Sequence, residues 1–303
     1  MRKLFTALLI VVFLQIQLQA QNVGIGTTNP AEKLDVNGNI NVSGTIKANG
    51  IDGNANQVLM KNNNGNLVWG DLCEFKNFES FSGAIVGQQW TIPAGITRVW
   101  VEIWGAGGGG NWYIGGGAGG YISAILDVSN ASTITYTIGG GGSGAANSDA
   151  SPGGSSSITY ILSPTLTPTL TASGGGGALY NSTPPALVSG GTGGGYTVPV
   201  YFRSYIGLRG GNGQHYITSL LQYPTATHEM IACGAGGDAP LVPETGGRGN
   251  VLLYDITNAT VIHSTNLLGL AKIPGGGGGS GCTRIGASII GSPGAAGMII
   301  FHY

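Results

Sequence analysis

Alternation of apolar and polar residues is strongest just before the first long glycine tract. There Val99, Val101 and Ile103 point one way, while Trp100, Glu102 and Trp104 point the other, which is the period of a β-strand. Apolar runs of strand length recur at 121–126, 134–138, 157–162, 251–256 and 298–303. Because no segment has a helical period, the pattern predicts an all-β fold.

Glycine tracts such as "GAGGGG", "GGGGSG" and "SGGTGGG" separate these strands. Strands punctuated in this way predict a β-sandwich or roll with long glycine-rich loops over residues 73–303. A polyglycine-II helix has no internal hydrogen bonds, so its N–H and C=O groups can pair with neighbouring helices. The tracts are short and interrupted by Tyr, Leu and Pro, which favours short polyglycine-II tracts over an extensive lattice.

Residues 21–72 have a different pattern, with short apolar pairs between Asn, Gly and Pro. The stretch "QVLMKNNNGNLVWG" predicts a hairpin with strands at 58–60 and 67–69. Too few apolar residues lie on any one face to bury a core, but three chains wound together could do so. We therefore predict a short fibrous β stalk that assembles as a homotrimer.

The first residues are typical of a signal peptide. Arg2 and Lys3 precede an apolar run at 4–14 that is too short to span a bilayer, and cleavage after Ala20 fits a small residue at that position. This predicts a signal peptide at 1–20 and a mature chain that is secreted, extracellular or held at the cell surface. No later run is apolar and long enough to predict a membrane span.

Charge excludes several partners. The chain has 303 residues with 58 glycines, 12 basic and 13 acidic residues, and a net charge of −1, so no nucleic-acid footprint is predicted. Carboxylates are sparse, and the histidines lack a metal-binding or catalytic spacing. We predict no enzyme activity, no cofactor and no metal site.

The chain has three cysteines, Cys73, Cys233 and Cys282. In an oxidising compartment, this odd number leaves one thiol that is free or forms a disulfide with another chain. Cys233 and Cys282 both lie beside glycine loops and could form a disulfide. No CxxC motif is present, so a metal or redox role is not predicted.

One tract matches a dinucleotide-binding pattern, Gly105-x-Gly107-x-x-Gly110, with Asp127 further on. That motif needs a helix directly after it, because the pyrophosphate sits at the helix N-terminus. The following "NWYIGGGAGG" is half glycine and cannot supply one. We interpret the glycines as a structural loop, and Asp127 as a strand-end residue that faces solvent or caps a turn.

Two further patterns are candidates for binding. In one segment, threonines alternate with Leu and Pro, at Thr165, Thr167, Thr169 and Thr171. This pattern predicts a half-buried edge strand. The alternative is a row of threonines that binds ice or a crystalline polysaccharide. Aromatic rings in or beside the glycine loops suit stacking on sugars or protein surfaces, or else pack back on the sandwich. These ligand-contact candidates are Trp112, Tyr113, Tyr180, Tyr196, Tyr201, Tyr205 and Tyr216.

Two resemblances extend this interpretation. "VGIGTTNPAEKLDVNGNI" and "NQVLMKNNNGNLVWGD" resemble motifs of trimeric phage tail-fibre shafts and related secreted bacterial surface proteins. From about residue 80, "WTIPAGITRVWVEIWGAGGGG", "GGAGGYISAILDV", "LTASGGGG" and "GAAGMIIFHY" resemble the glycine-rich domain of secreted bacterial proteins and phage tail adhesins. In tail adhesins, related tracts form packed polyglycine-II helices with host-contacting loops at the tip.

The resemblance implies a surface adhesin that binds an external surface, a glycan or a protein receptor through its aromatic loops. The alternative is a purely structural component of extracellular matrix or an appendage. An ice- or polysaccharide-binding protein is a minor alternative.

Overall fold

The computed structural model divides the chain into two compact units, Met1–Cys73 and Glu74–Tyr303. It describes residues 22–55, 57–62, 64–71, 75–180, 190–200, 202, 205–214, 217–221, 228–248, 251–255, 258, 260–265, 270–280 and 290–303. Every regular element in these residues is a β-strand, which confirms the predicted all-β fold. The predicted signal peptide lies outside the described residues.

The first unit consists of small two-stranded sheets. Parallel strands β1 (Val23–Ile25) and β2 (Leu34–Val36) form one, and β3 (Lys47–Ala48) pairs with β4 (Ile51–Asp52) in another. Strand β5 (Gln57–Lys61) pairs antiparallel with β6 (Leu67–Asp71), which confirms the predicted hairpin. The unit leaves these large apolar side chains exposed: Val23, Ile25, Leu34, Ile40, Val42, Ile46, Ile51, Leu59, Met60 and Leu67.

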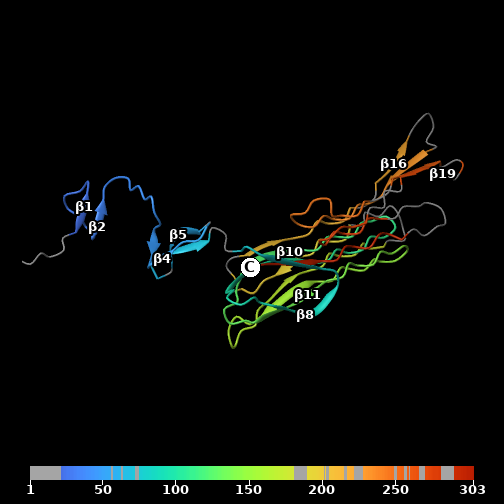
Figure 1. Ribbon diagram of the computed structural model, residues 1–303. Helices are drawn as coiled ribbons and strands as arrows, with labels where there is room; N and C mark the ends of the chain where they lie inside the picture. Colours follow the sequence, from blue (N-terminus) through green and yellow to red (C-terminus); the bar gives the residue numbers. More distant parts are fainter. Residues whose placement is uncertain are drawn as a thin grey trace, which may run out of the picture. The chain divides into compact units, whose positions relative to one another are not determined.

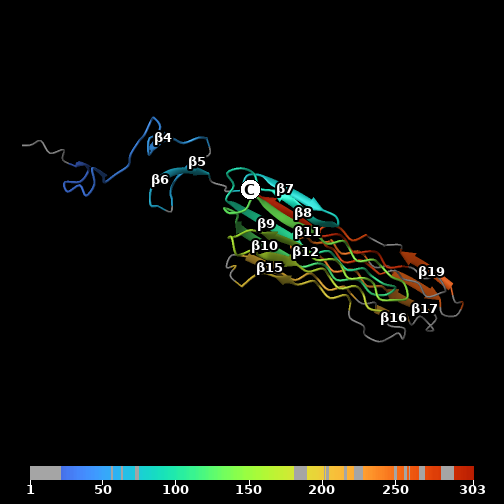
Figure 2. The same cartoon turned by 90° about the horizontal axis from the view of Figure 1, so that it is seen from below.

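A sandwich of two five-stranded sheets forms one end of the second unit (Figure 2). The first sheet, in order, is β15 (Tyr205–Leu208), β10 (Tyr121–Asp127), β9 (Arg98–Trp104), β20 (Met298–His302) and β7 (Phe78–Ser82). The second is β14 (Tyr196–Thr197), β13 (Thr169–Ala172), β12 (Ser156–Tyr160), β11 (Thr133–Ile138) and β8 (Ile85–Thr91). Strands β8 and β9 flank one turn but lie in opposite sheets, so the turn joins the two layers.

The alternation read from the sequence produces the core between the sheets. Val99, Val101 and Ile103 of β9 are fully buried there, and Trp90 stacks on Phe301 with ring centroids 4.5 Å apart. The last strand, β20, pairs with β9, and this pairing of two apolar strands from the two ends of the domain removes an exposed sheet edge. Strand β20 also pairs with β7, so it is an interior strand of the sheet.

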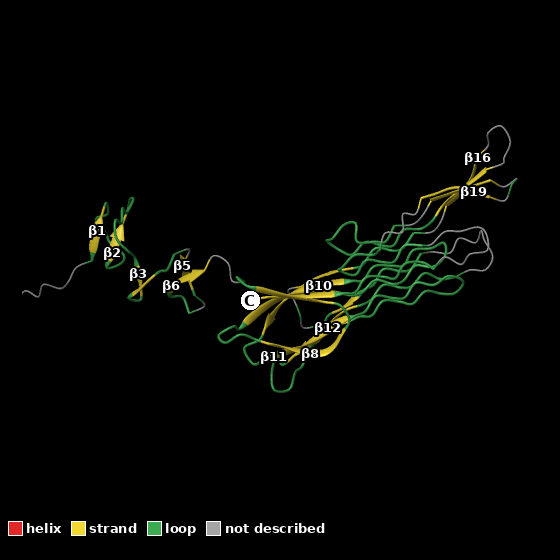
Figure 3. Cartoon of the chain, turned by 45° about the vertical axis from the view of Figure 1, so that its right-hand side comes forward, coloured by secondary structure: helices red, strands yellow, loops and turns green. Residues whose placement is uncertain are grey.

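Glycine-rich segments leave the sandwich, run outward and return (Figures 1 and 3). The first excursion runs from β9 through 105–111, turns, and comes back through 114–120 into β10. Others connect β11 to β12 and lead from β13 toward β14. At the outer end lies a four-stranded antiparallel sheet of β16 (Ile217–Leu221), β17 (His228–Ala232), β18 (Val251–Asp255) and β19 (Thr260–Thr265).

The glycine segments are joined to one another by backbone hydrogen bonds with a period of three residues. In segment 105–110, amide donors three residues apart reach the same neighbour. Gly105 donates its amide to the carbonyl of Gly120, and Gly108 donates to Gly117. Ala106 donates to Gly154, and Gly109 to Ser151. Gly107 donates to Ala295, and Gly110 to Ser292. This is the pattern expected of packed polyglycine-II helices, which have three residues per turn and no internal hydrogen bonds.

The returning segment 115–120 follows the same rule with other neighbours. Gly115 donates its amide to the carbonyl of Gln214, and Ala118 donates to Gly211. Gly116 donates to Gly278, and Gly119 to Gly275. Gly117 donates to Gly176, and Gly120 to Ser173. Both segments also accept bonds from further segments, for example Gly107 from Gly142 and Gly116 from Gly237. We call the assembly of these segments the glycine bundle.

The expectation of short tracts without an extensive lattice is therefore corrected in one respect. Each tract is short, but many passes of the chain lie side by side, so the lattice grows in width rather than in length. Glycine is required because the segments approach so closely: a Cβ on Gly107 would come within 3.0 Å of the carbonyl oxygen of Gly276, closer than Cβ atoms lie in proteins.

The predicted strand with four threonines in a row is wrong. Only Thr169 and Thr171 belong to β13, because the chain before it turns back at 163–166, where Leu166 donates its amide to Ser163. Thr169 instead faces Thr159 of β12, with their hydroxyl oxygens 2.8 Å apart. A four-threonine ladder for ice or polysaccharide is thus not formed.

Candidate functional site

The outer turn of the first excursion holds an aromatic pair. Asn111 is buried, and its Oδ1 accepts the amides of Tyr113 (3.2 Å) and Ile114 (3.0 Å), which fixes the turn. Its Nδ2 donates to the carbonyl of Leu179, 2.9 Å away on another excursion. The half-buried rings of Trp112 and Tyr113 stack, with centroids 4.6 Å apart and planes at 19°. We call these two rings the tip pair.

Other predicted ligand-contact residues separate into two groups. Tyr180 lies near the outer end of its excursion, where its amide donates to Asp149. Tyr196 and Tyr205 do not lie in glycine loops: they are on β14 and β15, each of which is one edge strand of its sheet, with ring centroids 6.2 Å apart. Tyr201 and Tyr216 lie outside the described residues. Among the described candidates, the structure therefore places Trp112, Tyr113 and Tyr180 on the excursions and Tyr196 and Tyr205 on the sandwich, not in one site.

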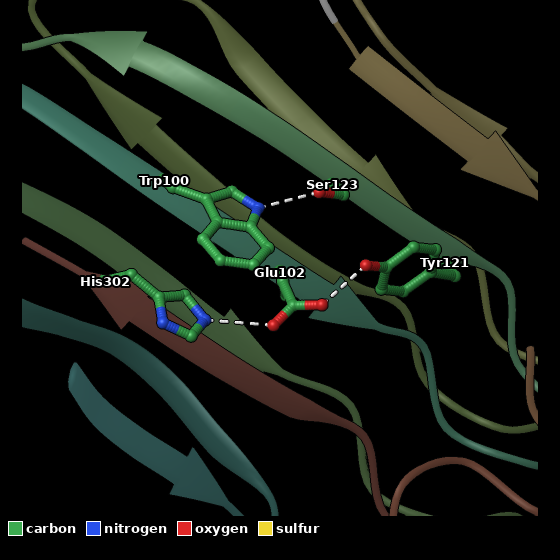
Figure 4. Close-up of polar contacts among 5 residues, drawn as sticks. All are labelled: Trp100, Glu102, Tyr121, Ser123 and His302. Carbon is green, nitrogen blue, oxygen red and sulfur yellow. Dashed lines mark hydrogen bonds and ion pairs between the residues drawn. The ribbon is translucent and has the colours of Figure 1, made fainter. Parts of the chain in front are cut away.

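A second cluster, missed by sequence reasoning, lies on the outer face of the first sheet (Figure 4). Strand β9 supplies Trp100 and Glu102, β10 supplies Tyr121 and Ser123, and β20 supplies His302. Carboxylate oxygens of Glu102 accept the Tyr121 hydroxyl at 2.6 Å and lie 2.9 Å from His302 Nε2. We call these five residues the outer-face cluster.

Trp100 is held on two sides within the outer-face cluster. Its ring stacks on His302 with centroids 4.1 Å apart and planes at 17°, and its Nε1 donates to Ser123 Oγ at 2.8 Å. Burial, followed by the hydrogen bond to Glu102, raises the pKa of Tyr121 well above its usual range. Tyr121 therefore remains a proton donor to Glu102 throughout the neutral range.

A hollow of about 470 Å³ lies beside Trp100. Its lining residues are Phe75, Trp100, Ser123, Ala124, Ile125, Tyr205 and Ile206. None of them carries a charge, and the exposed surface of the hollow is mostly apolar. Tyr205, one of the predicted contact residues, thus lines a concave site on the sandwich.

The sequence carried part of the signal for this cluster. The alternation in β9 places Trp100 and Glu102 on the face of the sheet opposite the core. A Trp next to a Glu is unusual on a face that contacts only solvent. The partner His302 lies 200 residues away in sequence. No local pattern could place it next to Trp100.

The segment that follows the nucleotide-like motif is extended backbone and not a helix. After Gly110 the chain turns at 111–114 and returns as an extended segment, so no helix N-terminus is available there for a pyrophosphate. Asp127 ends β10 and accepts the Ser129 amide and hydroxyl at 3.0 and 2.7 Å, which lowers its pKa. It caps a turn, as predicted.

Cys233 is disulfide-bonded, whereas Cys73 and Cys282 lie outside the described residues. Within the described ranges, no cluster of three or more His, Cys, Asp or Glu side chains could hold a metal ion. The same part of the chain contains no helix long and apolar enough to cross a bilayer.

Comparison with known proteins identifies the domain that forms most of the chain. The family model for the glycine-rich domain matches residues 80–303, so the chain belongs to that family. No curated protein matches the sequence.

Proposed function

We propose that this protein is a secreted, surface-exposed adhesin that contacts an external surface, glycan or protein receptor through the tip pair. The observation that carries the proposal is the position of Trp112 and Tyr113 at the outer turn of the first excursion, with the turn fixed by the buried Asn111. A stacked aromatic pair offers a large contact area at a low cost in side-chain entropy.

The glycine bundle supports this role because it can hold the tip pair in a fixed position. Its segments are bonded through backbone groups in several directions, so the turn is not a free loop. A contact surface that is ordered before binding loses less conformational entropy when it binds.

The apolar surface of the first unit supports a second part of the proposal, assembly as a homotrimer through residues 21–72. Side chains such as Ile25, Leu34 and Ile51 are 57%, 60% and 67% exposed in the single chain. Winding three copies together would bury them, at a gain of about 25 cal/mol per Å² of apolar surface. Three heads on one particle would then raise a weak contact to a useful avidity.

Binding of the purified mature chain to a glycan array and to intact cells tests the proposal. The variant Trp112→Ala/Tyr113→Ala should bind much more weakly, because losing an aromatic hot spot costs about 2 kcal/mol or more. Phe78→Ala is the matched control, since Phe78 is an exposed aromatic (67%) on the edge strand β7. Melting temperatures should show that all three proteins are folded. Equal binding by the tip variant would refute the assignment.

A purely structural role in matrix or an appendage is the second candidate. It is favoured by the glycine bundle itself, whose interior consists of backbone contacts and offers few side chains for recognition. Under this alternative, no surface or glycan would be bound specifically, and the tip variant would polymerise or co-assemble as well as the natural protein.

A further inference from the structure

We infer that the hollow beside Trp100 is a binding site for a small, uncharged, ring-shaped apolar molecule with a single hydroxyl, of the phenol class. It lies on the outer face of the sandwich, at β9, β10 and β15, and is separate from the tip pair. The inference does not depend on the proposed function.

Two aromatic rings form the recognition surface. Trp100 cannot turn freely, because His302 stacks on it and Ser123 accepts its Nε1 hydrogen. Phe75 lies across from it, with ring centroids 6.2 Å apart and planes tilted by 56°. Rings fixed before binding favour an aromatic ligand, since offset and edge-to-face contacts both become available to it.

Size and charge define the ligand further. A volume of about 470 Å³ falls within the range of small-molecule pockets, about 300–1,000 Å³. All the lining side chains are uncharged, so a charged ligand would lose its hydration without gaining an ionic partner. The occupant that fits is therefore small and neutral.

The few polar groups favour one hydroxyl over several. Ser123 Oγ already accepts from Trp100, and its own hydrogen is donated to Tyr121, which leaves one lone pair of Ser123 Oγ to accept a ligand hydroxyl. The Tyr205 side chain is the other polar group in the lining. A hexose carries more hydroxyls than these two groups can satisfy, and each unpaired one would cost binding free energy.

The test uses the purified full-length mature chain, with p-cresol as the probe. Calorimetry and saturation-transfer NMR measure the binding. Binding should occur with a dissociation constant of about 1 mM or tighter, as expected for a ligand of this size. The charged relative 4-methylbenzoate and the sugar methyl β-D-glucopyranoside should bind at least about tenfold more weakly, because the first lacks an ionic partner and the second lacks hydrogen-bond partners.

Two variants place a carboxylate at the wall of the hollow. Ile125→Asp and Ile206→Asp alter side chains that are 38% and 57% exposed, so folding should persist, and each should weaken p-cresol binding at least about tenfold. Val86→Asp is the matched control on β8 of the other sheet, where Val86 is 85% exposed, and it should bind like the natural protein.

Three results would overturn the inference. They are an absence of p-cresol binding at millimolar concentration, equal binding by folded Ile125→Asp and Ile206→Asp, and preferential binding of the glucoside or the benzoate. Because the tip pair is not altered in any of these proteins, adhesion measured in parallel would report separately on the proposed function.

Discussion

Gly105 donates its amide to the carbonyl of Gly120, 2.9 Å away, and this bond closes the base of the first excursion. The two residues follow β9 and precede β10 directly, so the antiparallel pairing of the strands continues into the glycine bundle. The glycines that resemble a nucleotide-binding motif are therefore used to join segments of the bundle.

Nucleotides should not bind at residues 105–110. The amides of this segment are already donated to other carbonyls, and no helix follows it. Thermal melting with NAD or ATP should match melting without them, whereas a ligand at 100 times its dissociation constant would add about 2.7 kcal/mol. A clear shift with either nucleotide would contradict this interpretation of the motif.

Replacing Gly107 by Ala should destabilise the second unit by about 3 kcal/mol or more, because the new Cβ would press on the carbonyl of Gly276 and overpack the bundle. Gly195→Ala is the matched control, since a Cβ there meets nothing within 4 Å, and it should cost less than about 1 kcal/mol. Urea unfolding of both variants gives the comparison. Similar losses in the two would show that close backbone approach is not what requires glycine.

Stability should fall as the pH rises above about 10, the usual pKa of tyrosine. Burial raises the pKa of Tyr121, and that of Tyr136 as well, so the folded chain holds these hydroxyls protonated. A group with a raised pKa stabilises the folded chain fully at pH values below its pKa in the unfolded chain. This stabilisation is lost as the pH rises toward its pKa in the folded chain. Urea midpoints between pH 8 and pH 11 measure the loss.

Tyr121→Phe should flatten this alkaline decline, with a residual slope left by Tyr136. At neutral pH the variant should be less stable by about 1–3 kcal/mol, because Glu102 loses the hydroxyl it accepts. If the variant showed the same alkaline slope as the natural chain, Tyr121 would not be responsible.

Deleting residues 298–303 should abolish folding of the second unit. Strand β20 lies between β9 and β7, and its Ile299 and Phe301 are fully buried in the core. Removing the strand would leave two unpaired edges and an open core. Cooperative thermal unfolding of a soluble truncated protein would argue against this.

The mature chain, residues 21–303, should form trimers at micromolar concentration, as light scattering can show. Ile25→Asp and Ile51→Asp should weaken the trimer, because each places a charge on a surface that assembly would desolvate. Asn49→Asp is a control in the same unit that keeps an exposed position polar. A monomeric natural chain would refute the stalk assignment.

Much of the sandwich could be predicted from the sequence, because a period of two residues fixes which face of each strand is buried. The strands around Val101, Ile122 and Ile158 follow from their apolar alternation, and the pairing of β20 with β9 follows from joining the two ends of one domain. The hairpin of β5 and β6 follows from its turn residues.

The glycine bundle and the outer-face cluster could not be predicted in the same way. Glycine has no side chain whose polarity reports direction, so a tract such as 275–280 gives no sign that Gly278 will accept from Gly116. The outer-face cluster depends on His302 meeting Glu102 across adjacent strands, which only the completed sheet brings about.

The three-residue period of the glycine bundle also limits how these segments can change in length. Inserting one residue into 105–110 would rotate every later amide by about 120°, toward a different neighbour, and would break the whole row of bonds that follows. An insertion of three residues would restore the original direction of each amide. Segment lengths therefore follow a rule of three: only changes by multiples of three residues keep each amide directed at its original neighbour.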